Sequence, residues 1–160
     1  MEAPLGASLA IAKKPLGAIS VAGLLVDTGF LVALYRRNDE LHESALAFLR
    51  DNREQLITVS PVVVEACHFL SIEARVHLLQ WIARTGLTVV DIAQVAYSKL
   101  ARLIEKYRNL DCDLADVALL WLATESGQRR ILTVDQRDFS TFRLPDRRRL
   151  QLVGWIIQAP

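Results

Sequence analysis

Four acidic residues stand at positions where they could share one site. Asp27 and Asp135 each follow a short apolar run, whereas Glu65 and Asp116 lie early in segments of helical periodicity. A carboxylate held near an apolar interior is unfavourable by several kcal/mol unless a helix N-terminus, a basic group or a cation compensates it. Several carboxylates together favour a hard cation that takes oxygen ligands, such as Mg²⁺ or Mn²⁺. The four acids therefore predict a divalent-cation site, provided that the fold brings them together.

Each acid also has an ordinary structural explanation. Asp27 and Asp135 can cap the helices that follow them, because aspartate is a preferred N-cap residue. Whether Asp116 is a metal ligand is also open, because Asp111, Asp113 and Asp116 lie close together at the start of one helix. Asp113 and Asp116 are three residues apart and share a face of that helix. In this alternative Asp113 is the N-cap and Asp116 stabilises the helix dipole. Spacing alone does not decide which of them would face a metal.

The order of apolar runs and helical segments predicts an α/β fold with a parallel sheet. Strands are expected at 24–26, 56–59, 87–90, 131–134 and 150–156, with helices at 29–35, from 39, from 60, at 71–84, 91–107 and 113–125. Ser60 is expected to cap its helix, with Pro61 in the first turn. Asp91 is expected to cap the long helix, with Val95 and Ile104 facing inward. Parallel strands bring their carboxyl ends to one edge, where ligands of open sheets bind, so all four acids are expected there.

Composition places the chain among globular proteins of one domain. It has 160 residues, of which 52% are hydrophobic and 23% charged, enough to bury a core without disulfides. Two cysteines, Cys67 and Cys112, are typical of a reducing cytosol, so a cytoplasmic location is expected. From Gly127 onward seven arginines face three aspartates, and this basic tail is compatible with a polyanionic ligand.

The first residues are expected to form a poorly ordered leader over 1–20, ahead of a single domain over 21–160. The apolar stretch at 5–12 is far shorter than the roughly 20 residues that a membrane span needs. Its basic residues follow the stretch rather than precede it, unlike in an export signal. No membrane segment is therefore expected.

The contexts of the four acids resemble the PIN-domain family. The matching stretches are Val26-Asp27-Thr28-Gly29-Phe30-Leu31, Val64-Glu65-Ala66, Leu114-Ala115-Asp116-Val117-Ala118 and Thr133-Val134-Asp135-Gln136-Arg137-Asp138-Phe139. The resemblance runs from about residue 24 to 157, and its closing stretch over 130–139 looks especially like the VapC toxins of bacterial toxin–antitoxin pairs. Each motif alone is weak, but their shared order and spacing are specific.

The resemblance implies a three-layer α/β/α fold and Mg²⁺- or Mn²⁺-dependent endonucleolytic cleavage of RNA. It selects Asp116 over Asp113, which is left as a helix cap or an outer residue. Thr28 and Thr133 match hydroxyl positions that orient carboxylates. Asp138 is a further candidate acid, and the candidates for holding the RNA backbone are Arg36, Arg37 and Arg137.

The resemblance also implies partners. It predicts a homodimer and a small VapB-like antitoxin with a segment over the active site, for which the helices at 29–35 and 41–49 could supply a groove. Two alternatives use the same residues: a housekeeping RNA-processing nuclease, and a PIN-like binding module without turnover.

Overall fold

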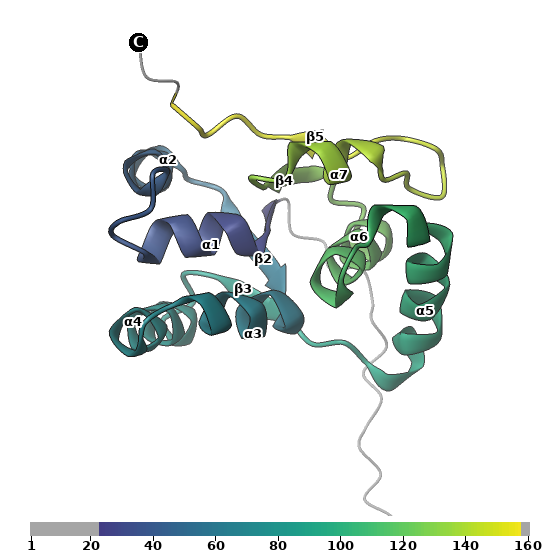
Figure 1. The fold of residues 1–160 in the computed structure, drawn as a ribbon, viewed down its shortest axis with the longest axis horizontal. Helices are drawn as coiled ribbons and strands as arrows, with labels where there is room; N and C mark the ends of the chain where they lie inside the picture. Colours follow the sequence, from purple (N-terminus) through teal and green to yellow (C-terminus); the bar gives the residue numbers. More distant parts are fainter. Residues whose placement is uncertain (1–22, 158–160) are drawn as a thin grey trace, which may run out of the picture.

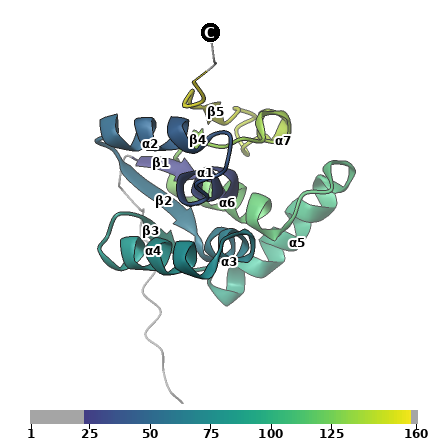
Figure 2. The same cartoon turned by 60° about the vertical axis from the view of Figure 1, so that its left-hand side comes forward.

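The computed structural model describes residues 23–157, in which five short strands form one parallel sheet. In chain order the strands are β1 (Gly23–Val26), β2 (Gln55–Val59), β3 (Thr88–Val90), β4 (Arg130–Leu132) and β5 (Gln151–Leu152). Their order across the sheet is β3-β2-β1-β4-β5, and Figures 1 and 2 show this stack running from β5 at the top to β3 at the bottom. The central strand β1 pairs through Leu25 with Ile57 on one side and Ile131 on the other. Its side chains are all buried, as its continuous apolar run predicts.

Seven α-helices cover the two faces of the sheet. They are α1 (Thr28–Tyr35), α2 (His42–Asp51), α3 (Ser60–Phe69), α4 (Ile72–Ala83), α5 (Tyr97–Lys106), α6 (Leu114–Ser126) and α7 (Gln136–Thr141). The chain adds strands from β1 to β3 in one direction and then returns to β4 and β5, so right-handed crossovers place the two groups of helices on opposite faces. Figure 1 shows α1, α2 and α4 on one side of the strands and α5, α6 and α7 on the other. The predicted three-layer α/β/α architecture is therefore confirmed.

The core is formed around β1, α1 and α6. Phe30 and Leu31 of α1 are fully buried, and α6 is buried at most positions from Ala115 to Ala123. A helix that is apolar on nearly every side belongs inside a domain. Gly127 ends α6 in the left-handed conformation, as its position predicted. Within the described residues, no helix is long and apolar enough to cross a membrane.

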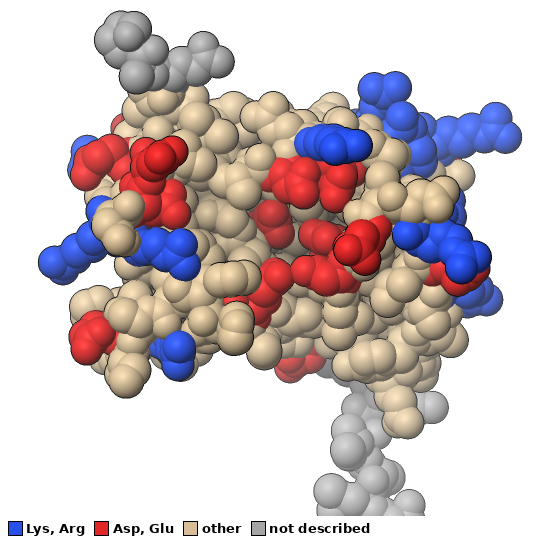
Figure 3. All heavy atoms as spheres, viewed as in Figure 1, with Lys and Arg blue, Asp and Glu red and all other residues tan. Residues whose placement is uncertain are grey.

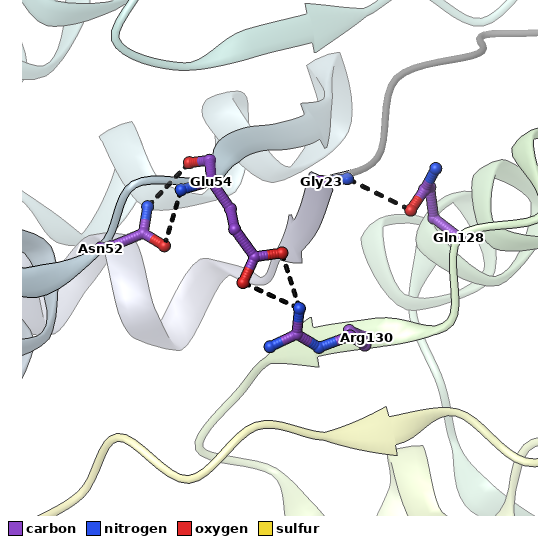
Figure 4. A network of polar contacts seen from close by, with 5 residues as sticks. All are labelled: Gly23, Asn52, Glu54, Gln128 and Arg130. Carbon is purple, nitrogen blue, oxygen red and sulfur yellow. Dashed lines mark hydrogen bonds and ion pairs between the residues drawn. The ribbon is translucent and has the colours of Figure 1, made fainter.

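Charges at the amino edge of the sheet are paired within the chain. Arg130, at the start of β4, donates to both carboxylate oxygens of Glu54, just before β2, at 2.6 and 2.8 Å. Beside this pair, Asn52 exchanges two hydrogen bonds with the backbone of Glu54, and the Gly23 amide donates to Gln128, as Figure 4 shows. The acid at this edge therefore has its own cation.

Four element boundaries differ from the sequence expectations. β4 ends at Leu132 rather than beside Asp135, and β5 has only two residues instead of the predicted 150–156. The helix that was predicted to start at residue 39 begins at His42. Ser60 is already inside α3 and makes no capping hydrogen bond, so its predicted role as a cap is wrong.

The long helix predicted over 91–107 is also wrong in its first part. A 3-10 turn over Gln94–Ala96 precedes α5, and Asp91 caps neither element. Val95 lies in this turn and is 72% exposed, and Ile104 of α5 is 40% exposed, so neither faces inward as predicted. The leader predicted over 1–20 lies outside the described residues.

Candidate active site

Asp27 is the most buried acid at the carboxyl edge of the sheet. It follows β1 directly and caps α1, and only 6% of it is exposed. Its Oδ1 accepts a hydrogen bond from the Thr28 amide at 2.7 Å, and its Oδ2 accepts one from the Thr133 hydroxyl at 2.7 Å. The carboxylate is therefore held rigidly at both oxygens, by neutral donors only.

Thr133 connects Asp27 to Asp135. While its hydroxyl donates to Asp27, the same oxygen accepts from the Asp135 amide at 2.9 Å. Asp135 in turn caps the short helix α7 by accepting from the Asp138 amide at 3.0 Å. Asp27 and Asp135 thus both act as helix caps, as the structural alternative predicted, and they are also neighbours at one edge.

Thr28 connects the same edge to α3. Its hydroxyl, in the first turn of α1, donates a short hydrogen bond to Oε2 of Glu65. Glu65 lies one turn into α3, which begins at the end of β2. The two threonines therefore orient two carboxylates that come from different parts of the chain.

Asp116 enters from the start of α6 together with Asp113. Asp113 is the N-cap and accepts from the Asp116 amide at 3.0 Å, while the Asp116 carboxylate accepts from the Asp113 amide at 3.2 Å. This reciprocal arrangement is a capping box. Both explanations of the crowded acids therefore apply at once, because the residues that cap α6 also face the other carboxylates.

Burial and mutual repulsion raise the pKa of three of these acids. The pKa of Asp27 rises to about 6, chiefly through burial, although its hydrogen bonds from Thr133 and Thr28 lower it. The pKa of Asp116 rises to about 7, again through burial first and then through the charge of Asp113. Burial also raises the pKa of Glu65. Each carboxylate makes its neighbours harder to ionise, which shows that they act as one electrostatic cluster.

No side-chain cation of the described chain neutralises this cluster. The ion pairs found within residues 23–157 are Lys99–Glu125, Arg108–Glu105, Arg130–Glu54 and Arg148–Asp146. None involves an acid of the carboxyl edge. Figure 3 shows the acidic side chains gathered in the middle of this face, between the regions of α3 and α7. The two edges of the sheet therefore differ: the acid at the amino edge is paired with an arginine, whereas the acids at the carboxyl edge form no ion pair with a side chain of residues 23–157.

The donor set at the carboxyl edge fits a hard divalent cation. All the groups are carboxylates, with hydroxyls that orient them, and Mg²⁺ prefers such oxygen ligands. Among residues 23–157, no group of three or more His, Cys, Asp or Glu side chains is arranged closely enough to hold a metal ion as it stands. An open arrangement suits Mg²⁺, which keeps several of its waters and completes its shell with phosphate oxygens. The residues that would hold the ion are Asp27, Glu65, Asp116 and Asp135.

The predicted basic residues lie at different distances from this cluster. Arg36 lines a hollow of about 330 Å³ together with Thr28, and its guanidinium donates to the Phe69 carbonyl at 2.7 Å. Arg37 lines a separate hollow beside α4. Arg137 is exposed in the first turn of α7. Arg36 thus lies at the C-terminal end of α1 and shares a hollow with Thr28, and Arg137 lies two residues after Asp135, whereas Arg37 does not line the same hollow as the threonine.

Asp113 is the residue of the cluster that sequence reasoning set aside. Its charge contributes to the raised pKa of Asp27, Glu65 and Asp116. The signal in the sequence was its three-residue spacing from Asp116, which puts both on one helix face. Asp111 is exposed, and its charge is not among the main causes of these shifts.

Comparison with known proteins agrees with this fold. The sequence model of the PIN domain matches residues 24–143, which include all four predicted acids. The chain belongs to the PIN-domain family. It is 27% identical over 125 residues to ribonuclease VapC26 of Mycobacterium tuberculosis, a match that covers 75% of this chain and 92% of that protein.

A solved structure has the same fold. The crystal structure of Mycobacterium tuberculosis VapC20, described as a toxin that cleaves the sarcin–ricin loop, superposes with a TM-score of 0.67. The superposition covers 72% of this chain and 92% of that one, at 17% sequence identity. At this identity the likeness establishes the shared α/β/α architecture.

Proposed function

We propose that the chain is a metal-dependent endoribonuclease that hydrolyses phosphodiester bonds in RNA, and that it is the toxin of a toxin–antitoxin pair. The observation that carries the proposal is the buried Asp27 carboxylate, placed near three further acids that form no ion pair with a side chain of residues 23–157. Membership of the PIN-domain family and the likeness to a VapC ribonuclease support it.

In this mechanism the chain supplies a rigid and negatively charged cradle. Asp27, Glu65, Asp116 and Asp135 would hold Mg²⁺ or Mn²⁺, which when bound lowers the pKa of a water and neutralises charge on phosphate. Thr133 and Thr28 fix two of the carboxylates before substrate arrives, so little reorganisation is needed during the reaction.

The positive charge around the cradle complements this role. Arg36, which shares a hollow with Thr28, and Arg137, in the first turn of α7, would contact the phosphates next to the scissile bond, which is salt-dependent electrostatic binding. Target preference would then come from the shape of the RNA around these contacts, because proteins recognise RNA largely through unpaired loops.

Incubation of the purified chain with RNA that contains single-stranded loops tests the proposal. We expect internal cleavage in the presence of Mg²⁺ or Mn²⁺, complete loss in excess EDTA and recovery when the ion is restored, because the carboxylates repel one another and the phosphate without it. Cleavage that continues in EDTA would contradict metal dependence. RNA that binds but stays intact with either ion would favour the binding module instead.

The biological role is tested separately from the chemistry. A toxin should arrest growth when the chain is expressed alone, and co-expression of a small protein from the neighbouring gene should restore growth. A housekeeping nuclease would cleave RNA in vitro without arresting growth. The two roles thus give different phenotypes for the same active site.

The surface beside the acids is suited to an antitoxin segment. A groove of about 630 Å³ runs between α3, α5 and α6, and it includes Glu65 and Asp113. Apolar side chains with 41 to 71% exposure border these acids, namely Val64, Phe69, Tyr97 and Leu114. A segment that pairs apolar residues with a lysine or arginine would complement this groove.

The groove differs from the one expected on the helices at 29–35 and 41–49. Phe30, Leu34 and Ala45 are buried in the core and cannot face a partner. From those two helices, Gly29, Val32 and Leu41 border the smaller hollow near Thr28. Ser44, Ala47 and Phe48 of α2 line a further hollow of about 570 Å³, but none of the four acids borders it. We therefore place the partner segment in the groove beside Glu65 rather than on the helices at 29–35 and 41–49.

Val64→Ser should weaken antitoxin binding by at least about tenfold, because a central apolar contact is usually worth more than 1 kcal/mol. Val95→Ser is the matched control, since Val95 is 72% exposed against 71% for Val64 but does not line the groove. Isothermal titration with the neighbouring gene product measures both affinities. Equal affinities for the two variants would show that the partner binds elsewhere.

We also propose a homodimer, as the family resemblance implies. The exposed apolar stripe of α4, formed by Ile72, Val76 and Leu79, follows the spacing of one helix face. Such a stripe is suited to packing against a second copy of the chain.

A further inference from the structure

Asp113 is tied to Asp116 by two reciprocal hydrogen bonds. Its carboxylate accepts from the Asp116 amide at 3.0 Å, and the Asp116 carboxylate accepts from the Asp113 amide at 3.2 Å. In a capping box each side chain is held by the backbone of the other residue. The direction of the Asp116 carboxylate therefore depends on Asp113.

Asp113 also contacts Glu65, which belongs to a different helix. The two carboxyl groups are within hydrogen-bonding distance of each other, and both residues line the same groove. Two carboxyl groups in such contact need a shared proton or a cation between them. Asp113 therefore joins the α6 side of the cluster to the α3 side.

Capping alone does not require a charge at this position. Serine and asparagine cap helices about as well as aspartate, and neither would repel Asp27, Glu65 and Asp116. The Asp113 charge acts on all three, and no ion pair of the described chain includes it. A cation at the carboxyl edge would offset this repulsion.

We infer that Asp113 is a positioning residue of the metal site, which orients Asp116 and Glu65 and strengthens ion binding through its charge. The inference rests on the proposed function, because it assumes that the four acids hold a divalent ion. It assigns a role in metal binding to Asp113, whose position at the start of α6 would otherwise be explained by helix capping alone.

Substitutions at Asp113 separate its charge from its cap. Asp113→Asn keeps a good N-cap but removes the charge, so we expect Mn²⁺ to bind about tenfold more weakly, as is typical when a group supporting a metal ligand is lost. The melting temperature of the ion-free variant should be no lower than that of the parent chain. Asp113→Ala should show the same loss of affinity and, because the cap is gone, melt about 2–4 °C lower.

Asp111→Asn is the matched control, since it removes the same charge two residues earlier. Asp111 and Asp113 are both exposed, but the charge of Asp111 is not among the main causes that raise the pKa of Asp27, Glu65 or Asp116. Its removal should therefore leave Mn²⁺ affinity within about twofold of the parent chain. Titration calorimetry with Mn²⁺ alone and thermal unfolding without it provide the two measurements.

The outcomes separate the inference from the proposed function. If the parent chain binds Mn²⁺ and Asp113→Asn binds it equally well, the inference is overturned and the proposed function stands. If the parent chain binds no Mn²⁺, the metal-dependent function fails and the inference fails with it. Weaker binding by Asp113→Asn, with Asp111→Asn unchanged, supports the inference.

Discussion

Replacement of Asp27 by asparagine should reduce RNA cleavage by a factor of roughly 100 to 1,000 and leave the fold intact. Asparagine has the shape of aspartate but lacks the charge that would hold a cation. Its side-chain oxygen can still accept from the Thr28 amide. Its amide group can donate to the Thr133 hydroxyl, which now donates to Asp27, so this hydrogen bond is kept with its direction reversed. The local contacts are therefore largely retained, and the main loss should fall on catalysis.

A charge-matched control distinguishes this effect from a general change in electrostatics. Asp51 is exposed at the end of α2, so Asp51→Asn removes one negative charge far from the cluster and should retain full activity. Cleavage rates with saturating Mn²⁺ compare the two variants, and circular dichroism checks the fold. If Asp27→Asn kept more than half of the activity, the acids at the carboxyl edge would not be the catalytic groups.

The convergence of the acids was predictable because it follows from topology. Asp27 directly follows a fully apolar strand, and parallel strands with helical crossovers must present their carboxyl ends together. β1 and α6 were also predictable, since a continuous apolar segment has few alternatives to burial. Such features depend on local sequence and a general rule of handedness, and neither requires knowledge of side-chain packing.

The edges of the fold were less predictable for a physical reason. The apolar residues at 150–156 suggested a full strand, but only Gln151 and Leu152 pair with β4. β4 itself has only three residues, so it offers few backbone groups for hydrogen bonds with β5. Strand length at a sheet edge is thus set by the adjacent strand, which the local sequence does not reveal.

The role of Asp113 depended on tertiary contacts. From the sequence, an aspartate three residues before another at a helix start indicates a cap, and the capping box shows that this is correct. The contact with Glu65 joins α6 to α3, and spacing along one helix cannot predict it. Asp113 therefore both caps α6 and belongs to the acidic cluster, whereas from the sequence these two roles were alternatives.

Stability without metal should depend on pH through Asp27. The pKa of this group is 3.8 in the unfolded chain and about 6 in the fold, chiefly because of burial. The unfolded chain therefore ionises more readily, and above pH 6 the fold carries a penalty of about 3 kcal/mol. The penalty shrinks as the pH falls from 6 toward 3.8, because the carboxyl group is then protonated in the fold.

Ion-free Asp27→Asn should consequently be more stable than the parent chain at pH 8, and the difference should decrease by about 1.4 kcal/mol at pH 5. Urea unfolding of both proteins in EDTA at the two pH values measures this difference, and Asp51→Asn should follow the parent chain at both. A difference that stays constant or grows toward pH 5 would contradict the assignment of a raised pKa to Asp27.

Addition of Mn²⁺ should reverse the penalty. An ion that binds only the folded chain stabilises it in proportion to the logarithm of its concentration relative to Kd, and protons compete with it for the same carboxylates. The increase in melting temperature with Mn²⁺ should therefore be larger at pH 8 than at pH 5, and much smaller in Asp27→Asn. An equal increase at both pH values would place the ion away from Asp27 and Asp116, whose pKa values of about 6 and 7 lie between them. The burial and mutual repulsion of carboxylates that destabilise the ion-free fold are the same properties that would make this edge bind a divalent cation.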